Sequence, residues 1–126
     1  MKFVVSAAFQ PPERLIEIAK AADECGYDAI AMPDHVVFPE TLDTPYPYTE
    51  DGQRRYDERS DFPDAWVTIG ALSTITRRIH FTNNVFVVPM RNPFLLAKQI
   101  ATLDKLESDR PHPPGGFGGP PRHTTG

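Results

Sequence analysis

Cysteine is almost absent from this chain of 126 residues, which contains only Cys25. A single cysteine excludes an internal disulfide and a zinc site built from several thiolates. Long hydrophobic runs are also missing, because no run approaches the roughly 18 apolar residues that a membrane-spanning helix needs. Positive charge is not in excess, since 13 Lys and Arg residues face 17 Asp and Glu residues. A net charge of −4 without any basic cluster argues against nucleic acid and anionic membranes as partners.

The rest of the composition is that of an ordinary globular domain, with 40% hydrophobic and 24% charged residues. A chain of this length has room for one modest domain. Its first residues read as a strand rather than as a signal peptide, so we expect a cytoplasmic protein.

The first 32 residues predict a strand, a helix and a second strand. Residues 2–8 form a short run rich in β-branched and aromatic residues, and Pro12 suits the first position of a helix. Gly26 is typical of the position just beyond a helix. Between them, apolar residues recur at helical spacing: Leu15, Ile18, Ala19 and Ala22. A second strand follows from Ala29, and this order indicates a βαβ unit and a parallel sheet.

A long polar segment, residues 36–63, follows the second strand and is punctuated by prolines. Loops of this length in compact domains tend to be functional lids or binding loops, and the alternative is a disordered insertion. Aromatic side chains usually find something to pack on, so we expect an ordered loop. The aromatic residues are Phe38, Tyr46, Tyr48, Tyr56 and Phe62.

The pattern continues with a helix at 64–76, a strand at 79–88 and a helix at 92–107. Thr82, Asn83 and Asn84 interrupt the strand, and two adjacent amides are costly to bury unless each finds hydrogen-bond partners. Asn92 followed by proline is a strong helix start. In the first helix, apolar residues recur at three-residue steps: Trp66, Ile69, Leu72 and Ile75. The second helix is expected to bury Leu96, Ile100 and Leu103.

Three polar sites should meet at the carboxyl edge of this parallel sheet: Ser6, the pair Asp34-His35, and the segment Asn83-Asn84-Val85. Histidine ordinarily titrates near neutral pH, so His35 is a candidate general base. Asp34 could orient His35 or contact a ligand directly. Alternatively, Asp34 caps a turn, His35 is an ordinary surface residue, and the asparagines form a β-bulge that satisfies its own hydrogen bonds. His80, inside the strand, is more typical of a core residue than of a ligand.

Four stretches, in this order and spacing, resemble the bacterial-luciferase-like flavin and deazaflavin oxidoreductases. They are residues 15–39, 46–52, 71–93 and 95–106, which include the motifs AIAMPDHVVFP, YPYTEDG, FTNNVFVVPMRNP and LLAKQIATLDKL. The Asp34-His35 step and the long loop look most like the subgroup that uses coenzyme F-420, a deazaflavin.

The resemblance implies an α/β fold, a TIM barrel of which this chain holds the first three βα units, with the cofactor at the carboxyl ends of the strands. It implies a non-prolyl cis peptide at Asn84-Val85 that supports the cofactor ring, with Ser6 and Asp34 near the same cofactor. It also implies catalysis by His35 and Asp34. His35 would take a proton from a small-molecule substrate while hydride moves to the deazaflavin, and Asp34 would contact the cofactor or substrate. An FMN-dependent monooxygenase of the same superfamily is the alternative.

The match ends near residue 106. From Pro111 onward, ten of sixteen residues are Pro or Gly, a composition that cannot continue a packed α/β fold. We therefore expect residues 1–108 to form the N-terminal part of a luciferase-like barrel and residues 109–126 to form a disordered tail. A one-base shift of reading frame near codon 110 would account for the tail, because the shifted frame can encode the strand with which the family continues. The nucleotide sequence tests this hypothesis.

A chain of three strands cannot close a barrel, and this gives a further alternative. The chain would then be an inactive truncated fragment without enzymatic activity. Its open sheet edges would favour self-association into homo-oligomers.

Overall fold

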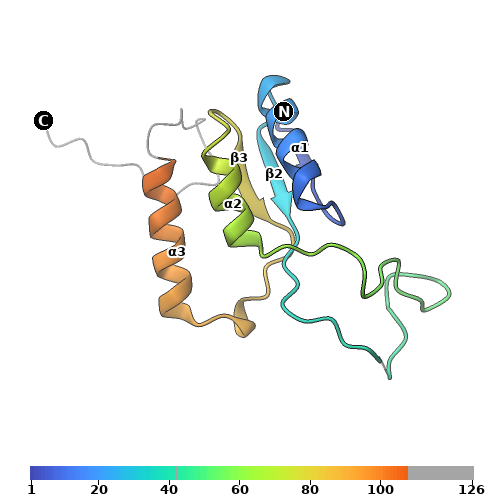
Figure 1. The fold of residues 1–126 in the computed structure, drawn as a ribbon. Coiled ribbons are helices and arrows are strands. Elements are labelled where there is room, and N and C mark those ends of the chain that lie inside the picture. Colours follow the sequence, from blue (N-terminus) through green and yellow to red (C-terminus); the bar gives the residue numbers. More distant parts are fainter. Residues whose placement is uncertain (42, 108–126) are drawn as a thin grey trace, which may run out of the picture.

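The computed structural model describes residues 1–41 and 43–107, and Figure 1 shows their arrangement. Three short strands, β1 (Val4–Ser6), β2 (Ala29–Met32) and β3 (His80–Asn83), form the sheet. The three helices are α1 (Pro12–Glu24), α2 (Ala65–Ser73) and α3 (Pro93–Leu106), and a short 3-10 turn, η1 (Val88–Met90), precedes α3. The predicted tail at 109–126 and its boundary at residue 108 lie outside the described residues.

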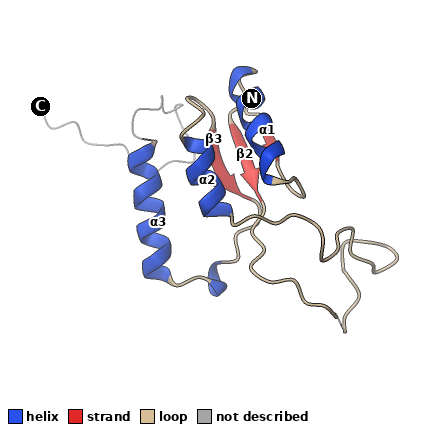
Figure 2. Ribbon diagram, viewed as in Figure 1, coloured by secondary structure: helices blue, strands red, loops and turns tan. Residues whose placement is uncertain are grey.

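The sheet is parallel throughout, with strand order β1-β2-β3, which confirms the predicted α/β class (Figure 2). Every residue of β2 is buried, because β2 lies between its two neighbours. In register, Ser6 lies beside Ala31, and Ala31 lies beside Thr82. The three strands therefore end together at one edge, which is the edge where the polar sites were predicted to meet.

A single apolar core joins one face of the sheet to the helices. Ile30 and Met32 of β2 and Ile79, which precedes β3, are almost fully buried. They pack with helix residues Leu15, Ala19, Ala22, Ala65, Ile69 and Leu72. Burial of such side chains is the main source of stability in a domain of this size, at roughly 25 cal/mol per Å² of apolar surface. The core thus holds the sheet in place behind the edge that carries the polar residues.

Four helix boundaries follow directly from local chemistry. Pro12 stands at the first position of α1, and Gly26, with φ +79°, ends the turn beyond it. Asp64 caps α2, because its side chain accepts hydrogen bonds from the backbone N–H groups of Trp66 and Val67, both at 3.0 Å. Asn92 caps α3 in the same way, through the N–H groups of Phe94 and Leu95.

Some predicted details were wrong. The third strand ends at Asn83 rather than at Val88, because the backbone after it leaves the sheet and turns into η1. The first strand covers only Val4–Ser6 of the predicted 2–8. Ile100, which was predicted to be buried, is 46% exposed, and Ile75, which was predicted to lie in the helix, follows the end of α2 and is 40% exposed. The described part of α3 has no fully buried residue, since it packs mainly against α2.

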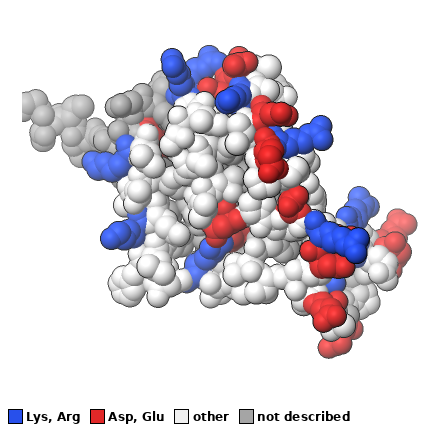
Figure 3. All heavy atoms as spheres, viewed as in Figure 1, with Lys and Arg blue, Asp and Glu red and all other residues white. Residues whose placement is uncertain are grey.

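Charge is unevenly distributed over the surface. Acidic and basic side chains gather on the long loop, at the lower right of Figure 3. A broad uncharged area lies over α2 and α3. Exposed apolar residues of these two helices include Val67 and Leu95, which are 71% and 64% exposed. No helix in the described part of the chain is both long and apolar enough to span a membrane.

Candidate functional site

The carboxyl edge of the sheet carries the candidate site, because β1, β2 and β3 all end there. Two backbone hydrogen bonds extend the sheet beyond the strands: the N–H of Ala7 donates to Ala31 O at 3.0 Å, and the N–H of Asn84 donates to Met32 O at 2.9 Å. The chain segments that follow the three strands are thereby held side by side. Ser6 lies at this edge at the end of β1 and is exposed, as a residue open to a ligand must be.

The peptide bond between Asn84 and Val85 is cis, although Val85 is not proline. The structure confirms the backbone geometry that the family resemblance implied at this position. The side chain of Val85 is 75% exposed, which leaves an apolar surface open directly beyond β3. Among the described residues, Asn83 Nδ2 is buried and has no hydrogen-bond partner. An unpartnered donor on a residue two positions before an exposed apolar side chain is a feature that a bound group can complete.

Asp34 is buried, with only 3% of its surface exposed, and it lies two residues beyond β2. One carboxylate oxygen, Oδ2, accepts a hydrogen bond from the N–H of Val87 at 3.1 Å. The other, Oδ1, forms an ion pair with Arg91 Nη2. A buried carboxylate needs such partners, because transfer of an unpaired charge out of water is costly. Asp34 therefore links the end of β2 to the segment after the cis peptide.

Arg91 extends this ion pair into a group of three charges. Its Nη1 lies 3.0 Å from Asp64 Oδ2, so the guanidinium binds Asp34 and Asp64 at the same time. Burial alone would raise the pKa of Asp64, but hydrogen bonds from Val67 and Arg91 outweigh it and lower that pKa. Hydrogen bonds to Asp64 and Asp34 raise the pKa of Arg91, so this residue stays fully charged.

His35 has a different environment from its neighbour Asp34. Its side chain is exposed, and its ring packs against aromatic rings of the long loop, with centroid distances of 4.4 Å to Phe62 and 5.4 Å to Tyr56. Phe9, just beyond β1, contacts the same two rings at 5.2 and 5.3 Å. Phe9 adopts φ +59°, a left-handed backbone conformation that is unusual for a bulky residue. Aromatic packing, rather than contact with Asp34, sets the surroundings of the imidazole.

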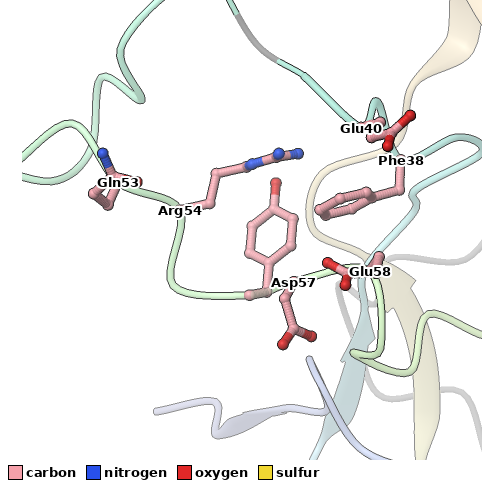
Figure 4. Close-up of a pocket in the computed structure, with 7 residues that line it drawn as sticks. Phe38, Glu40, Gln53, Arg54, Asp57 and Glu58 are labelled. Atoms are coloured by element: carbon pink, nitrogen blue, oxygen red, sulfur yellow. The ribbon is translucent and has the colours of Figure 1, made fainter.

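The long loop forms a hollow of its own next to this aromatic group. A cavity of about 510 Å³ is lined by Phe38, Glu40, Gln53, Arg54, Tyr56, Asp57 and Glu58 (Figure 4). The Arg54 side chain reaches across it, its guanidinium carbon 4.1 Å from the Phe38 ring centroid and its Nη1 3.1 Å from Pro39 O. These contacts agree with the prediction of an ordered loop. In the described residues, no three His, Cys, Asp or Glu side chains gather in a way that could hold a metal ion.

Sequence reasoning identified the edge of the sheet but missed several residues in it. Arg91 lies 57 positions from Asp34, and no local pattern connects the two. Tyr56 and Phe62 were predicted only as aromatic residues in need of packing partners, and Phe9 was not identified at all. His80 is half-buried within β3, away from this edge, as its position in a strand indicated.

Comparison with known proteins gives consistent results. The model of the luciferase-like monooxygenase family matches residues 1–112. The uncharacterized protein Rv0940c of Mycobacterium tuberculosis is 36% identical over 110 residues, which cover 87% of this chain and 38% of that protein. The uncharacterized protein Mb0965c of Mycobacterium bovis shows the same values. Rv0953c of M. tuberculosis, also uncharacterized, is 34% identical over 100 residues, covering 79% of this chain and 36% of that protein.

A solved structure shares the fold. It is the oxygenating constituent of 3,6-diketocamphane monooxygenase from Pseudomonas putida, a type II Baeyer-Villiger monooxygenase in complex with FMN. The TM-score is 0.61 at 18% sequence identity, over 86% of this chain and 27% of that one. The chain thus spans less than two fifths of the length of these relatives. On the family match, which extends over most of its length, this chain belongs to the luciferase-like monooxygenase family.

Proposed function

We propose that this chain forms the ring-binding edge of an oxidoreductase that transfers hydride between a small organic substrate and coenzyme F-420. The observation that carries the proposal is the meeting of Ser6, Asp34 and the exposed Val85 at the carboxyl edge of the parallel sheet. Ligand sites in open and barrel α/β folds lie at this edge. The candidate base, His35, follows the neighbouring strand at the same edge.

The residues present fit a flat, partly apolar ring system. Val85 offers an exposed apolar surface, the buried Asn83 Nδ2 offers a donor without a partner in the described residues, and Ser6 offers a hydroxyl at the adjacent strand end. When bound, a deazaflavin would supply the acceptor for hydride. Asn84 and Val85 would hold one face of the ring, and Ser6 would contact its edge. Asp34 would contribute through Val87 and Arg91, to which its two oxygens are bonded.

His35 would carry the proton in this reaction. When an alcohol is oxidised to a carbonyl compound, the C–H bond delivers hydride and the O–H bond releases a proton. A neutral imidazole nitrogen can accept that proton, and it can return the proton when the reaction runs in reverse. The exposed His35 side chain is accessible to a substrate, and its contacts with Tyr56 and Phe62 restrict where the ring lies.

An FMN-dependent monooxygenase is the second candidate, and the FMN complex of the solved neighbour favours it. The same edge would hold the ring of FMN. Residues that bind cofactor phosphate in such barrels follow the seventh and eighth strands. The described residues contain three strands, so the cofactor ring, rather than its phosphate, is what this segment can select.

Titration of the purified chain with coenzyme F-420 and with FMN, followed by cofactor fluorescence, tests the proposal. We expect saturable binding in the micromolar range, with the tighter cofactor deciding between the two enzyme classes. Val85→Asp should weaken binding, because it places a charge against the ring. Val67→Asp is the matched control, since Val67 is a similarly exposed valine on α2. If neither cofactor binds, the chain is an inactive fragment.

The cytoplasmic location and self-association through the sheet edges stay predictions, which fractionation and sedimentation would test.

A further inference from the structure

Arg91 contacts both ends of the long loop. The loop, residues 36–63, leaves the sheet just after Asp34 and ends just before Asp64, the residue that caps α2. Arg91 Nη2 binds Asp34 Oδ1, and Arg91 Nη1 lies 3.0 Å from Asp64 Oδ2. One guanidinium therefore joins two carboxylates that are thirty positions apart in the sequence.

The surroundings of Arg91 fix this bridge. Its side chain is only 16% exposed, and that of Asp34 is 1% exposed. The guanidinium carbon lies 5.8 Å from the ring centroid of Phe86, and Phe86 packs edge-on against Trp66 at 5.5 Å. A planar guanidinium presents several N–H donors in a fixed geometry, so it can bind two carboxylates at once; a lysine ammonium is a single point charge without this geometry.

The bridge also reaches the proposed cofactor edge. Asp34 Oδ2 accepts a hydrogen bond from the N–H of Val87, two residues beyond the cis peptide at Asn84-Val85. Arg91 itself lies only four residues beyond Val87. The Asp34–Arg91 pair therefore connects the residues that flank the loop to the backbone that follows Val85.

We propose that Arg91 is a positioning residue, which fixes the two ends of the long loop against the segment that carries Asn84-Val85. Arg91 acts through Asp34 and Asp64 and does not itself touch a ligand. The long loop carries Tyr56 and Phe62, which contact His35, so the position of the imidazole depends on the same bridge. The consequence for cofactor binding rests on the proposed function, whereas the consequence for the loop does not.

Limited trypsin digestion of the intact chain tests the loop. The loop contains trypsin sites after Arg54, Arg55 and Arg59, and Lys20 in the middle of α1 provides a reference site whose cleavage requires the helix to open. We expect Arg91→Met to raise the ratio of loop cleavage to Lys20 cleavage about tenfold, because the loop opens locally while the core stays folded. Mass spectrometry of the fragments measures both rates.

Three further variants sharpen the test. Arg91→Lys keeps the charge and should rescue only part of the effect. Asp64→Asn keeps a good helix cap and removes one ion pair, so it should give an intermediate rise in loop cleavage. Arg14→Met is the matched control, because it removes an exposed arginine from α1 and one trypsin site, and it should leave the ratio unchanged. If the cleavage rates at the loop sites and at Lys20 rise equally in Arg91→Met, Arg91 stabilises the whole fold and not the loop in particular. That result would overturn the proposal.

Cofactor titration separates the two proposals. If the unmodified chain binds coenzyme F-420 or FMN, Arg91→Met should weaken that binding about tenfold, a loss of about 1.4 kcal/mol, while Arg14→Met does not. Unchanged affinity in Arg91→Met would show that the bridge does not position the cofactor edge. If the unmodified chain binds neither cofactor, the proposed function fails, and the digestion ratio still decides the role of Arg91 in the loop.

Discussion

The carboxylate of Asp23, on α1, accepts a hydrogen bond at 2.7 Å from the backbone N–H of Ile79, 56 positions away. The same carboxylate also accepts from the N–H groups of Arg77 and Arg78, at 3.0 and 2.8 Å. These three donors lie in the turn that leads from α2 into β3. Asp23 thus fixes the turn through which β3 enters the sheet, at the end opposite to the candidate site.

Asp23→Ala should lower the free energy of unfolding by about 1–3 kcal/mol, because the N–H groups of the turn lose a charged acceptor. Urea unfolding followed by circular dichroism measures the change. Glu17→Gln, an exposed carboxylate on the same helix, is the control and should have little effect. Equal stability of Asp23→Ala and Glu17→Gln would contradict the role assigned to Asp23.

Stability should fall in acid, and Asp23 should account for part of the fall. Burial alone would raise the pKa of Asp23, but hydrogen bonds from Arg77, Ile79 and Arg78 outweigh it, so that pKa is lowered. A carboxylate with a lowered folded-state pKa adds stability that is fully present above its unfolded pKa of about 3.9. That stability is lost as the pH falls through the folded pKa. Urea unfolding between pH 7 and pH 3 should show a shallower decline for Asp23→Asn, and parallel curves would contradict this prediction.

Two glycines should respond to alanine in opposite directions. Gly70 lies in α2, where an added Cβ would meet only Leu103 Cδ2 at 3.8 Å, so Gly70→Ala should stabilise the chain by about 0.5–1 kcal/mol. Gly26 has φ +79°, and Gly26→Ala should destabilise the chain by about 1–2 kcal/mol despite the open space around it. Thermal unfolding measures the melting temperature of both variants. Shifts of the same sign in the two melting temperatures would contradict this prediction.

Asp64→Ala should lower the free energy of unfolding by about 0.5–2 kcal/mol, because α2 loses the acceptor for two of its first N–H groups. Asp64→Ser restores a capping oxygen without restoring the ion pair with Arg91. The difference between the alanine and serine variants in urea unfolding therefore reports the cap alone. If Asp64→Ser is as unstable as Asp64→Ala, the loss of stability comes from the broken ion pair with Arg91 and not from the lost helix cap.

The order of elements was accessible from the sequence because it depends on local chemistry. The helical spacing of Leu15, Ala19 and Ala22, the stop at Gly26 and the cap at Asn92 are all properties of short segments, and the structure confirms them. The apolar run at Ala29–Met32 predicted a buried central strand, and it is fully buried. Parallel strands then place Ser6, Asp34 and Asn84 at one edge.

Contacts between distant positions were not accessible in this way. Nothing near Asp34 indicates that its partners are Val87 and Arg91, since a carboxylate at the end of a strand suits a ligand as well as an ion pair. The cis bond at Asn84-Val85 followed from family resemblance and not from the residues themselves. Ile100 has helical spacing typical of a core residue, yet the described structure leaves it 46% exposed, because spacing defines a face and not what covers it.

The long loop begins and ends at two carboxylates that share one guanidinium, and this has a consequence for evolution. Because Arg91 joins the two carboxylates that flank the loop, this link does not depend on the loop's own sequence, and the segment between them can change in sequence and length without removing it. A segment of this kind can be exchanged between relatives as a unit, provided that the three charged residues at its base are kept together.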